Sequence, residues 1–115
     1  MKATDSHINY IELLAHDLEK TKAFYTSVFN WKFTDYGPNY IAFDNCGLQG
    51  GFEKTDQAIV NGALVVLYHS DLETIKTKVE AAGAIISKEI FDFPGGRRFH
   101  FIDPSGNDLA IWSDK

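Results

Sequence analysis

The chain shows the same order of apolar and polar positions twice. An apolar run with strand character comes first in each half, at positions 8–14 and again at 63–68. Each run is followed within a few residues by the tripeptide Asp-Leu-Glu, which begins at Asp17 and at Asp71. Short runs rich in β-branched and aromatic side chains are typical of strands, so the pattern predicts a strand and then a helix in each half.

The segments after these runs have the features of amphipathic helices. Asp17 and Asp71 are predicted N-caps, because a short carboxylate accepts hydrogen bonds from the free N–H groups of the first turn. Asn30 and Gly83 follow the last helical positions, and both residue types adopt the left-handed conformation that ends a helix. The predicted apolar stripes are Leu18, Tyr25 and Val28 flanked by Phe24, and Leu72, Ile75, Val79 and Ala82, with Lys76, Lys78 and Glu80 facing water.

Short strands separated by turn sequences are expected after each helix. Turn signals rich in Gly, Pro and Asn occur at 37–39, 45–47, 94–96 and 103–107. The repeat therefore predicts an α+β fold with two βαβββ modules, at about 7–54 and 61–114, inside one domain that covers 1–115. We expect the modules to form a curved mixed sheet with an open concave cup and with the helices on its outer face.

Alternation along the strands predicts which side chains face this cup. Successive side chains of a strand point to opposite faces, and the apolar residues Ile11, Leu13, Phe99 and Phe101 suit the helix side. The positions left for the cup are Tyr10, Glu12, Leu64, Tyr68, Arg98, His100, Ala110 and Trp112.

Composition and charge exclude several classes of function. The formal net charge is -5, whereas nucleic-acid binding needs a cationic face. No apolar run approaches the ~20 residues that span a bilayer, and the N-terminus lacks the apolar segment of a secretion signal. The lone Cys46 excludes an intrachain disulfide, and we expect it to be a small buried apolar residue. These features predict a soluble cytoplasmic protein with no nucleic-acid or membrane partner.

Two motifs in sequence order carry a family resemblance. The first is Asp-Leu-Glu-Lys-Thr-Lys-Ala-Phe-Tyr at 17–25, followed by Val-Phe-Asn-Trp at 28–31, and the second is Phe-Ile-Asp-Pro-Ser-Gly-Asn at 101–107. Together they resemble the vicinal oxygen chelate superfamily, which contains glyoxalase I, bleomycin resistance proteins and extradiol dioxygenases. The resemblance covers roughly 8–113 and is closest to bacterial glyoxalase-related proteins of unassigned activity.

Metal-dependent members of this superfamily hold a divalent cation with four cup-facing residues, usually His, Glu and sometimes Gln. The resemblance places three of these positions at Tyr10, Leu64 and Ala110, and the fourth near Gln49. Leucine and alanine have no donor atom, neutral tyrosine is a poor ligand, and one glutamine cannot hold a cation by itself. We therefore expect no metal ion and no other cofactor. Glu12 with His100 would be an off-pattern pair with too few ligands.

Several candidate residues have both a functional and a structural interpretation. Glu12 is either a desolvated carboxylate that acts as a base, or the partner of an ion pair with Arg98 or of a dimer contact. His100 either carries a proton or makes a structural hydrogen bond. Arg98 either clamps an anionic group of a ligand or closes a salt bridge. A set of aromatic side chains either forms a stacking wall for a ligand or fills the cup: Tyr10, Tyr40, Tyr68 and Trp112.

The resemblance and these residues lead to three hypotheses of function. The first is a metal-free protein that binds a small organic molecule in the cup, as bleomycin resistance proteins do, through Tyr10, Gln49, Leu64, Tyr68, Arg98, Ala110 and Trp112. The second is a lyase or isomerase that uses Glu12 or His100 as the proton carrier. The third is an interaction module whose cup is filled by side chains. We expect a homodimer, because modules of this superfamily associate in pairs and exposed sheet edges are usually covered.

Overall fold

The computed structural model describes residues 5, 8–60 and 62–115. The chain divides into two compact units, one that ends at Gln57 and one that begins at Ala58. We call them the first and the second module and describe each by itself. This division falls between the two predicted modules at about 7–54 and 61–114.

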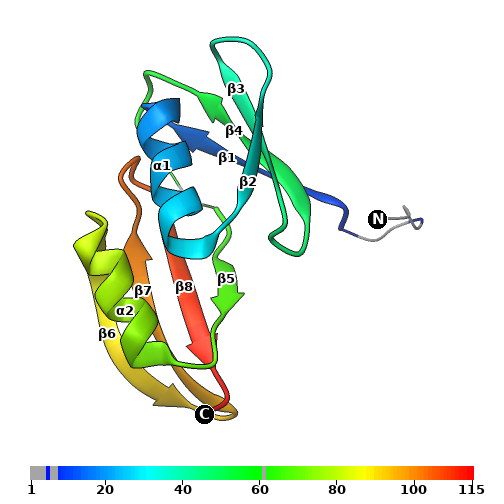
Figure 1. The fold of residues 1–115 in the computed structure, drawn as a ribbon. Helices are drawn as coiled ribbons and strands as arrows, with labels where there is room; N and C mark the ends of the chain where they lie inside the picture. Colours follow the sequence, from blue (N-terminus) through cyan, green and yellow to red (C-terminus); the bar gives the residue numbers. More distant parts are fainter. Residues whose placement is uncertain (1–4, 6–7, 61) are drawn as a thin grey trace. The chain divides into compact units, whose positions relative to one another are not determined.

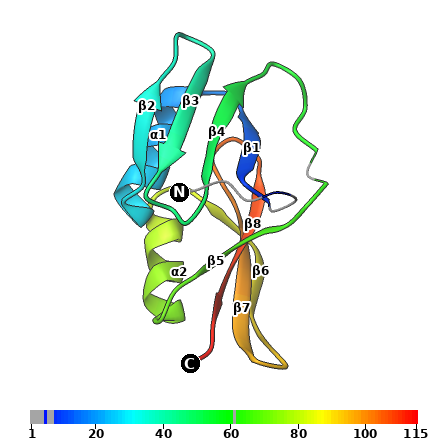
Figure 2. The same ribbon diagram turned by 90° about the vertical axis from the view of Figure 1, so that its right-hand side faces the viewer.

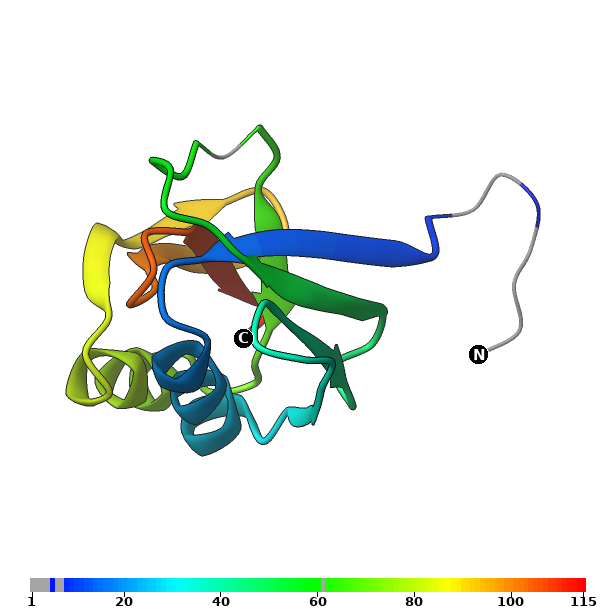
Figure 3. The same ribbon diagram turned by 90° about the horizontal axis from the view of Figure 1, so that it is seen from above.

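The first module contains one helix and four strands (Figure 1). The elements in chain order are β1 (Tyr10–Ala15), α1 (Leu18–Phe29), β2 (Lys32–Asp35), β3 (Tyr40–Asp44) and β4 (Gln49–Lys54). The strands form one sheet in the order β1-β4-β3-β2, with β1 and β4 parallel and the other pairs antiparallel. Seen from above, β1 (blue) runs alongside β4 (green) (Figure 3).

The second module repeats this arrangement. Its elements are β5 (Val65–Tyr68), α2 (Leu72–Ala81), β6 (Ile85–Phe93), β7 (Gly96–Ile102) and β8 (Asp108–Ser113). The strand order is β5-β8-β7-β6, again with one parallel pair, β5 and β8, at the edge. The prediction of an α+β fold built from two βαβββ modules with mixed sheets is therefore confirmed.

The predicted helix ends are confirmed in detail. The carboxylate of Asp17 accepts a hydrogen bond from the Lys20 N–H (3.0 Å), and that of Asp71 accepts one from the Thr74 N–H (3.1 Å). Asn30 has a φ of 61° and Gly83 has a φ of 100°, so both stop their helices in the left-handed conformation.

Each helix packs its apolar stripe on one face of its own sheet. In the first module Tyr25 stacks on Trp31 (4.6 Å between centroids) and lies 5.3 Å from the Phe52 ring. In the second module Leu72, Ile75 and Val79 are buried on α2, as are Phe99 and Phe101 on β7. Figure 2 shows α1 behind β2 and β3. We call the opposite side of each sheet its open face.

The turn at 103–107 is also confirmed and has a buried carboxylate at its centre. Asp103 is 4% exposed, and its Oδ1 accepts hydrogen bonds from the Ser105 and Asn107 N–H groups, both at 2.9 Å. Gly106 has a φ of 102°, which glycine adopts without strain. The turn therefore holds β7 and β8 in register.

Three details of the sequence prediction are wrong. β1 and β5 begin two residues later than expected, at Tyr10 and Val65, so Leu64 precedes its strand. Lys76 does not face water freely, because its side chain is 19% exposed and pairs with Glu80 and Glu89. Cys46 is only half buried, and its Sγ donates to a backbone carbonyl in its own turn.

In the described part of the chain, neither helix has the length and apolar character that crossing a membrane requires.

Candidate functional site

The open face of the first sheet places three predicted site residues together. Tyr10 on β1 is the register partner of Gln49 on β4, and Glu12 is the partner of Gly51. Side chains of residues paired in this way lie on the same side of the sheet. Tyr10 is 46% exposed and Glu12 is exposed as well, which does not support the interpretation of Glu12 as a desolvated carboxylate.

A hydroxyl pair crosses this face. The hydroxyl groups of Tyr10 and Tyr40 form a hydrogen bond, although the two residues come from β1 and β3, with β4 between them. Burial raises the pKa of Tyr40 well above its usual value, and the Tyr10 hydroxyl and the Glu12 carboxylate raise the pKa further. Tyr40 therefore stays neutral over the whole physiological range.

Gly51 makes this crossing sterically feasible. It lies on β4 between the two tyrosines, and a Cβ atom built there would come within 2.5 Å of the Tyr40 hydroxyl oxygen and 2.6 Å of the Ile41 carbonyl oxygen. Such distances are far below van der Waals contact. Any side chain at this position would push the Tyr40 ring away from Tyr10.

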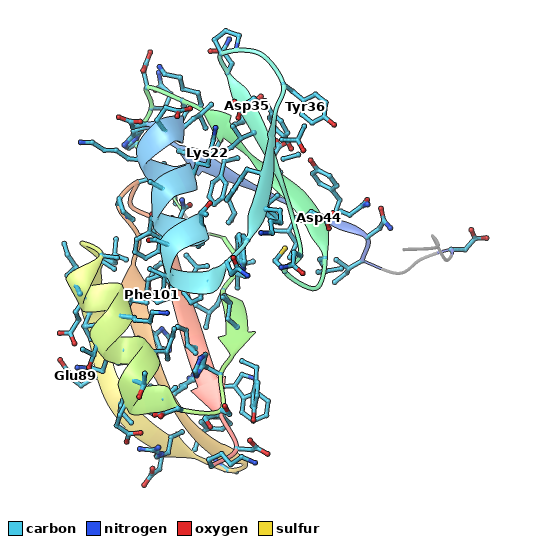
Figure 4. The ribbon with its side chains drawn as sticks, in the orientation of Figure 1. Lys22, Asp35, Tyr36, Asp44, Glu89 and Phe101 are labelled. Atoms are coloured by element: carbon cyan, nitrogen blue, oxygen red, sulfur yellow. The ribbon has the colours of Figure 1, made fainter. Side chains whose placement is uncertain are left out.

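A hollow of about 430 Å³ adjoins the hydroxyl pair. Its wall combines aromatic rings with one carboxylate and one carboxamide: Tyr10, Thr34, Tyr36, Tyr40, Ala42, Phe43, Asp44, Gln49 and Gly50. Figure 4 places Tyr36 and Asp44 on the side of the first sheet away from α1. The hollow has the size of a site for a small organic molecule.

The open face of the second sheet centres on Arg98. Its guanidinium carbon lies 5.1 Å from the centre of the Phe91 ring and 5.4 Å from that of Phe93. The Nε atom is buried and has no hydrogen-bond partner among the described residues. By contrast, the neighbouring Arg97 forms a bidentate pair with Glu73. Among the described residues of its own module, Arg98 therefore has aromatic neighbours and no counter-ion.

His100 lies beside Arg98 on the same face. Its register partners are Ala110 on β8 and Lys88 on β6, and the Phe91 ring is 5.9 Å from the imidazole. The Nε2 atom is buried without a hydrogen-bond partner in the described residues. Burial lowers the pKa of His100, and the positive charge of Arg98 lowers it further, against a smaller opposing effect of Asp108. A neutral imidazole is therefore favoured at neutral pH.

Two further aromatic residues complete the second open face. Tyr68 and Trp112 are register partners with ring centroids 5.2 Å apart, and Phe93 lies 6.3 Å from Trp112. The Tyr68 hydroxyl donates to Asp114 at 2.7 Å. Tyr68 is half exposed, so an aromatic surface remains accessible there.

The residues at the family's metal-ligand positions do not fit a metal ion. Tyr10 and Gln49 are adjacent, but the Tyr10 hydroxyl already interacts with Tyr40. Leu64 is an exposed residue before β5, and Ala110 is fully buried, so neither offers a donor atom. Among the described residues no three His, Cys, Asp or Glu side chains converge. A hard or borderline cation needs more nitrogen and oxygen ligands than this set provides.

Sequence reasoning missed several residues of both faces. Asp44 and Tyr36 belong to the first hollow, and Phe91 and Phe93 frame Arg98. The alternating pattern of β6 would have indicated Phe91 and Phe93, but register shifts between Ile86 and Phe91 interrupt it. The position of Asp44 in the hollow could not be predicted, because it depends on how β3 and β4 pair.

Solved structures with the same fold come from several bacteria. A glyoxalase/bleomycin resistance protein/dioxygenase family enzyme from Burkholderia phytofirmans PsJN is 17% identical, with a TM-score of 0.81 over 93% of this chain and 98% of that chain. A glyoxalase-related enzyme from Fulvimarina pelagi is 19% identical, with a TM-score of 0.79 over 94% and 88%. The fosfomycin resistance protein FosX from Listeria monocytogenes is 20% identical, with a TM-score of 0.81 over 96% and 94%.

Identities this low establish a common fold and leave the activity open. No curated protein matches the sequence. The family model of the Glyoxalase/Bleomycin resistance protein/Dioxygenase superfamily matches residues 7–111, nearly the whole chain. The repeated βαβββ topology and the motifs at both ends of that match agree with it. The protein therefore belongs to the Glyoxalase/Bleomycin resistance protein/Dioxygenase superfamily.

Proposed function

We propose that this protein binds a small organic molecule and does so without a metal ion. The observation that carries the proposal is the hollow of about 430 Å³ beside Tyr10. It adjoins the first metal-ligand position of the family, where a tyrosine hydroxyl replaces a metal-binding group. The other three positions, Gln49, Leu64 and Ala110, supply a single carboxamide between them.

The open face of the second module supports the same function. The rings of Tyr68 and Trp112 and the guanidinium of Arg98 are the kinds of groups that hold a planar or anionic part of a ligand. Because Arg98 has no ion pair with a described residue of its own module, a ligand anion would replace water at the guanidinium without first breaking a salt bridge.

Metal addition and ligand screening test the proposal together. We expect nickel, zinc and manganese to leave the melting temperature of purified protein unchanged, with or without EDTA. We expect some members of a small-molecule library to raise the melting temperature and to change the fluorescence of Trp112. A metal-induced stabilisation that EDTA abolishes would contradict the metal-free site. A library without any binder would contradict the binding function.

A second candidate function is that of a lyase or isomerase with His100 as the proton carrier. The supporting observation is the lowered pKa of His100 together with its unpartnered Nε2, because a neutral imidazole can accept a proton. Since Nε2 is buried, the substrate would have to displace a neighbouring side chain. Turnover that the His100→Gln variant abolishes while ligand binding persists would favour this candidate.

We further propose that the protein is a homodimer. Several large apolar side chains are exposed, among them Val66 on the second open face at 44%. Covering such surfaces is a common reason for association. Sedimentation should give about twice the chain mass of 12.9 kDa, and a monomer at all concentrations would contradict the proposal.

A further inference from the structure

The hydroxyl groups of the first open face keep acceptor capacity toward the hollow. The Tyr10 and Tyr40 hydroxyls share one hydrogen bond, in which either oxygen can be the donor. A hydroxyl oxygen has two lone pairs, so the Tyr10 oxygen can accept a further hydrogen bond whichever direction this bond takes. Tyr10 therefore offers an acceptor to a ligand in the hollow.

The charged group of the hollow is also an acceptor. Asp44 contributes a carboxylate that accepts a hydrogen bond from the Asn45 N–H at 2.8 Å and still has a free oxygen lone pair. No Lys, Arg or His side chain is part of the wall. Lys32 is the register partner of Asp44, yet within the described residues the two form no ion pair. The charge in the wall of the hollow, among the described residues, is therefore the negative charge of Asp44.

The aromatic part of the wall suits the same kind of ligand. The rings of Tyr10, Tyr36 and Tyr40 line the hollow, and the negative faces of such rings attract organic cations. A carboxylate ligand would instead meet the negative charge of Asp44. Like charges in a partly enclosed site repel each other, so the hollow should discriminate strongly against anions.

We propose that the hollow of the first module binds an organic cation, a ring or short chain that carries a protonated amine. The ammonium N–H groups donate to the Tyr10 hydroxyl oxygen and to the Asp44 carboxylate, and the apolar part lies against the Tyr36 ring. This inference rests on the proposed binding function and adds the chemical class of the ligand.

Three probes of equal size test the ligand class. Benzylammonium, benzyl alcohol and benzoate differ mainly in charge and can be titrated into ¹⁵N-labelled protein while amide shifts are followed. We expect benzylammonium to move the amides of Ala42, Gly50 and Gly51 with an affinity about tenfold higher than benzyl alcohol. Benzoate should leave these amides unchanged.

Two variants test the named contacts. Asp44→Asn keeps the size and the acceptor oxygen but removes the charge, and Tyr10→Phe removes only the hydroxyl. We expect each to weaken benzylammonium binding about five- to tenfold and to leave benzyl alcohol binding nearly unchanged. Asp56→Asn is the matched control, because Asp56 is an exposed carboxylate of the same module outside this hollow. Thermal unfolding establishes that each variant is folded.

The outcomes separate the two proposals. If benzoate or benzyl alcohol moves the three amides with the affinity of benzylammonium, the ligand class is wrong while binding in the hollow stands. If Asp44→Asn binds benzylammonium as tightly as the unchanged protein does, the charge contact is wrong. If no probe moves any amide of the protein, the ligand class is wrong and the binding function loses its support as well.

Discussion

The sheets of the two modules have the same topology, but their open faces carry different polar groups. The first face contains tyrosine hydroxyls and the carboxylates of Glu12 and Asp44, and the second contains Arg98 and His100 among aromatic rings. On the helix side the modules are alike, since both bury a continuous apolar layer. Packing against a helix therefore makes one side of each sheet apolar, while the open sides of the two sheets carry different polar groups.

The two open faces also differ in whether their polar side chains have hydrogen-bond partners. In the first module the Tyr40 hydroxyl is paired with Tyr10 and lies close to Glu12. In the second module Arg98 Nε and His100 Nε2 are buried without partners in the described residues. A paired group stabilises the fold, whereas an unpaired one costs stability and remains ready for a ligand. The variants below test this difference.

The largest effect is expected for Gly51→Ala. The added methyl group would collide with the Tyr40 hydroxyl and with the backbone oxygen of Ile41, so the hydroxyl pair should break and unfolding free energy should fall by about 2 kcal/mol. Urea denaturation measures the loss. Gly62→Ala is the control, because no atom lies within 4 Å of a Cβ there. Equal stability of the two variants would mean that Tyr40 does not need this space.

Tyr40→Phe should have the next largest effect. It removes the hydrogen bond to Tyr10, which should lower the unfolding free energy by about 1 kcal/mol at neutral pH. The raised pKa of Tyr40 means that the folded state keeps its proton where the unfolded state has lost it. Stability should therefore fall as the pH rises above about 10, the ordinary tyrosine value, and the variant should show a weaker fall. An unchanged alkaline profile would contradict this account.

Arg98→Met should have a small effect of the opposite sign. Methionine fills the space between Phe91 and Phe93 and removes a charge without a counter-ion, so stability should stay the same or rise by up to about 1 kcal/mol. Arg97→Met is the matched comparison, because it breaks the exposed pair with Glu73 and should lower stability slightly. A clear loss for Arg98→Met would show that the guanidinium has a partner in solution.

The smallest effect is expected for His100→Gln at acid pH. The lowered pKa of His100 means that the unfolded state takes up the proton first as the pH falls. Its contribution to stability is therefore complete above about pH 6.5 and declines below that value. Replacing His100 should make the acid side of the stability profile flatter, while the alkaline side should not change. Denaturation at a series of pH values measures both sides in one experiment.

The sequence by itself determined the repeat, the helices and the side of each strand that is buried. Asp17, Asp71, Asn30 and Gly83 act through hydrogen bonds and backbone angles within a few residues, so local patterns identify them. The alternation along β1, β7 and β8 likewise placed Tyr10, Arg98, His100 and Trp112 on their open faces. The absence of metal-binding groups at the family positions was also evident from residue types alone.

The tertiary structure decided how these side chains meet. The contact of Tyr10 with Tyr40 depends on strand order, since β4 lies between their strands and only Gly51 leaves room for the ring. The frame of Phe91 and Phe93 around Arg98 depends on the shifted register of β6. Strand pairing joins residues that are far apart in the chain, and each such contact is set by backbone hydrogen bonds whose register no local pattern specifies.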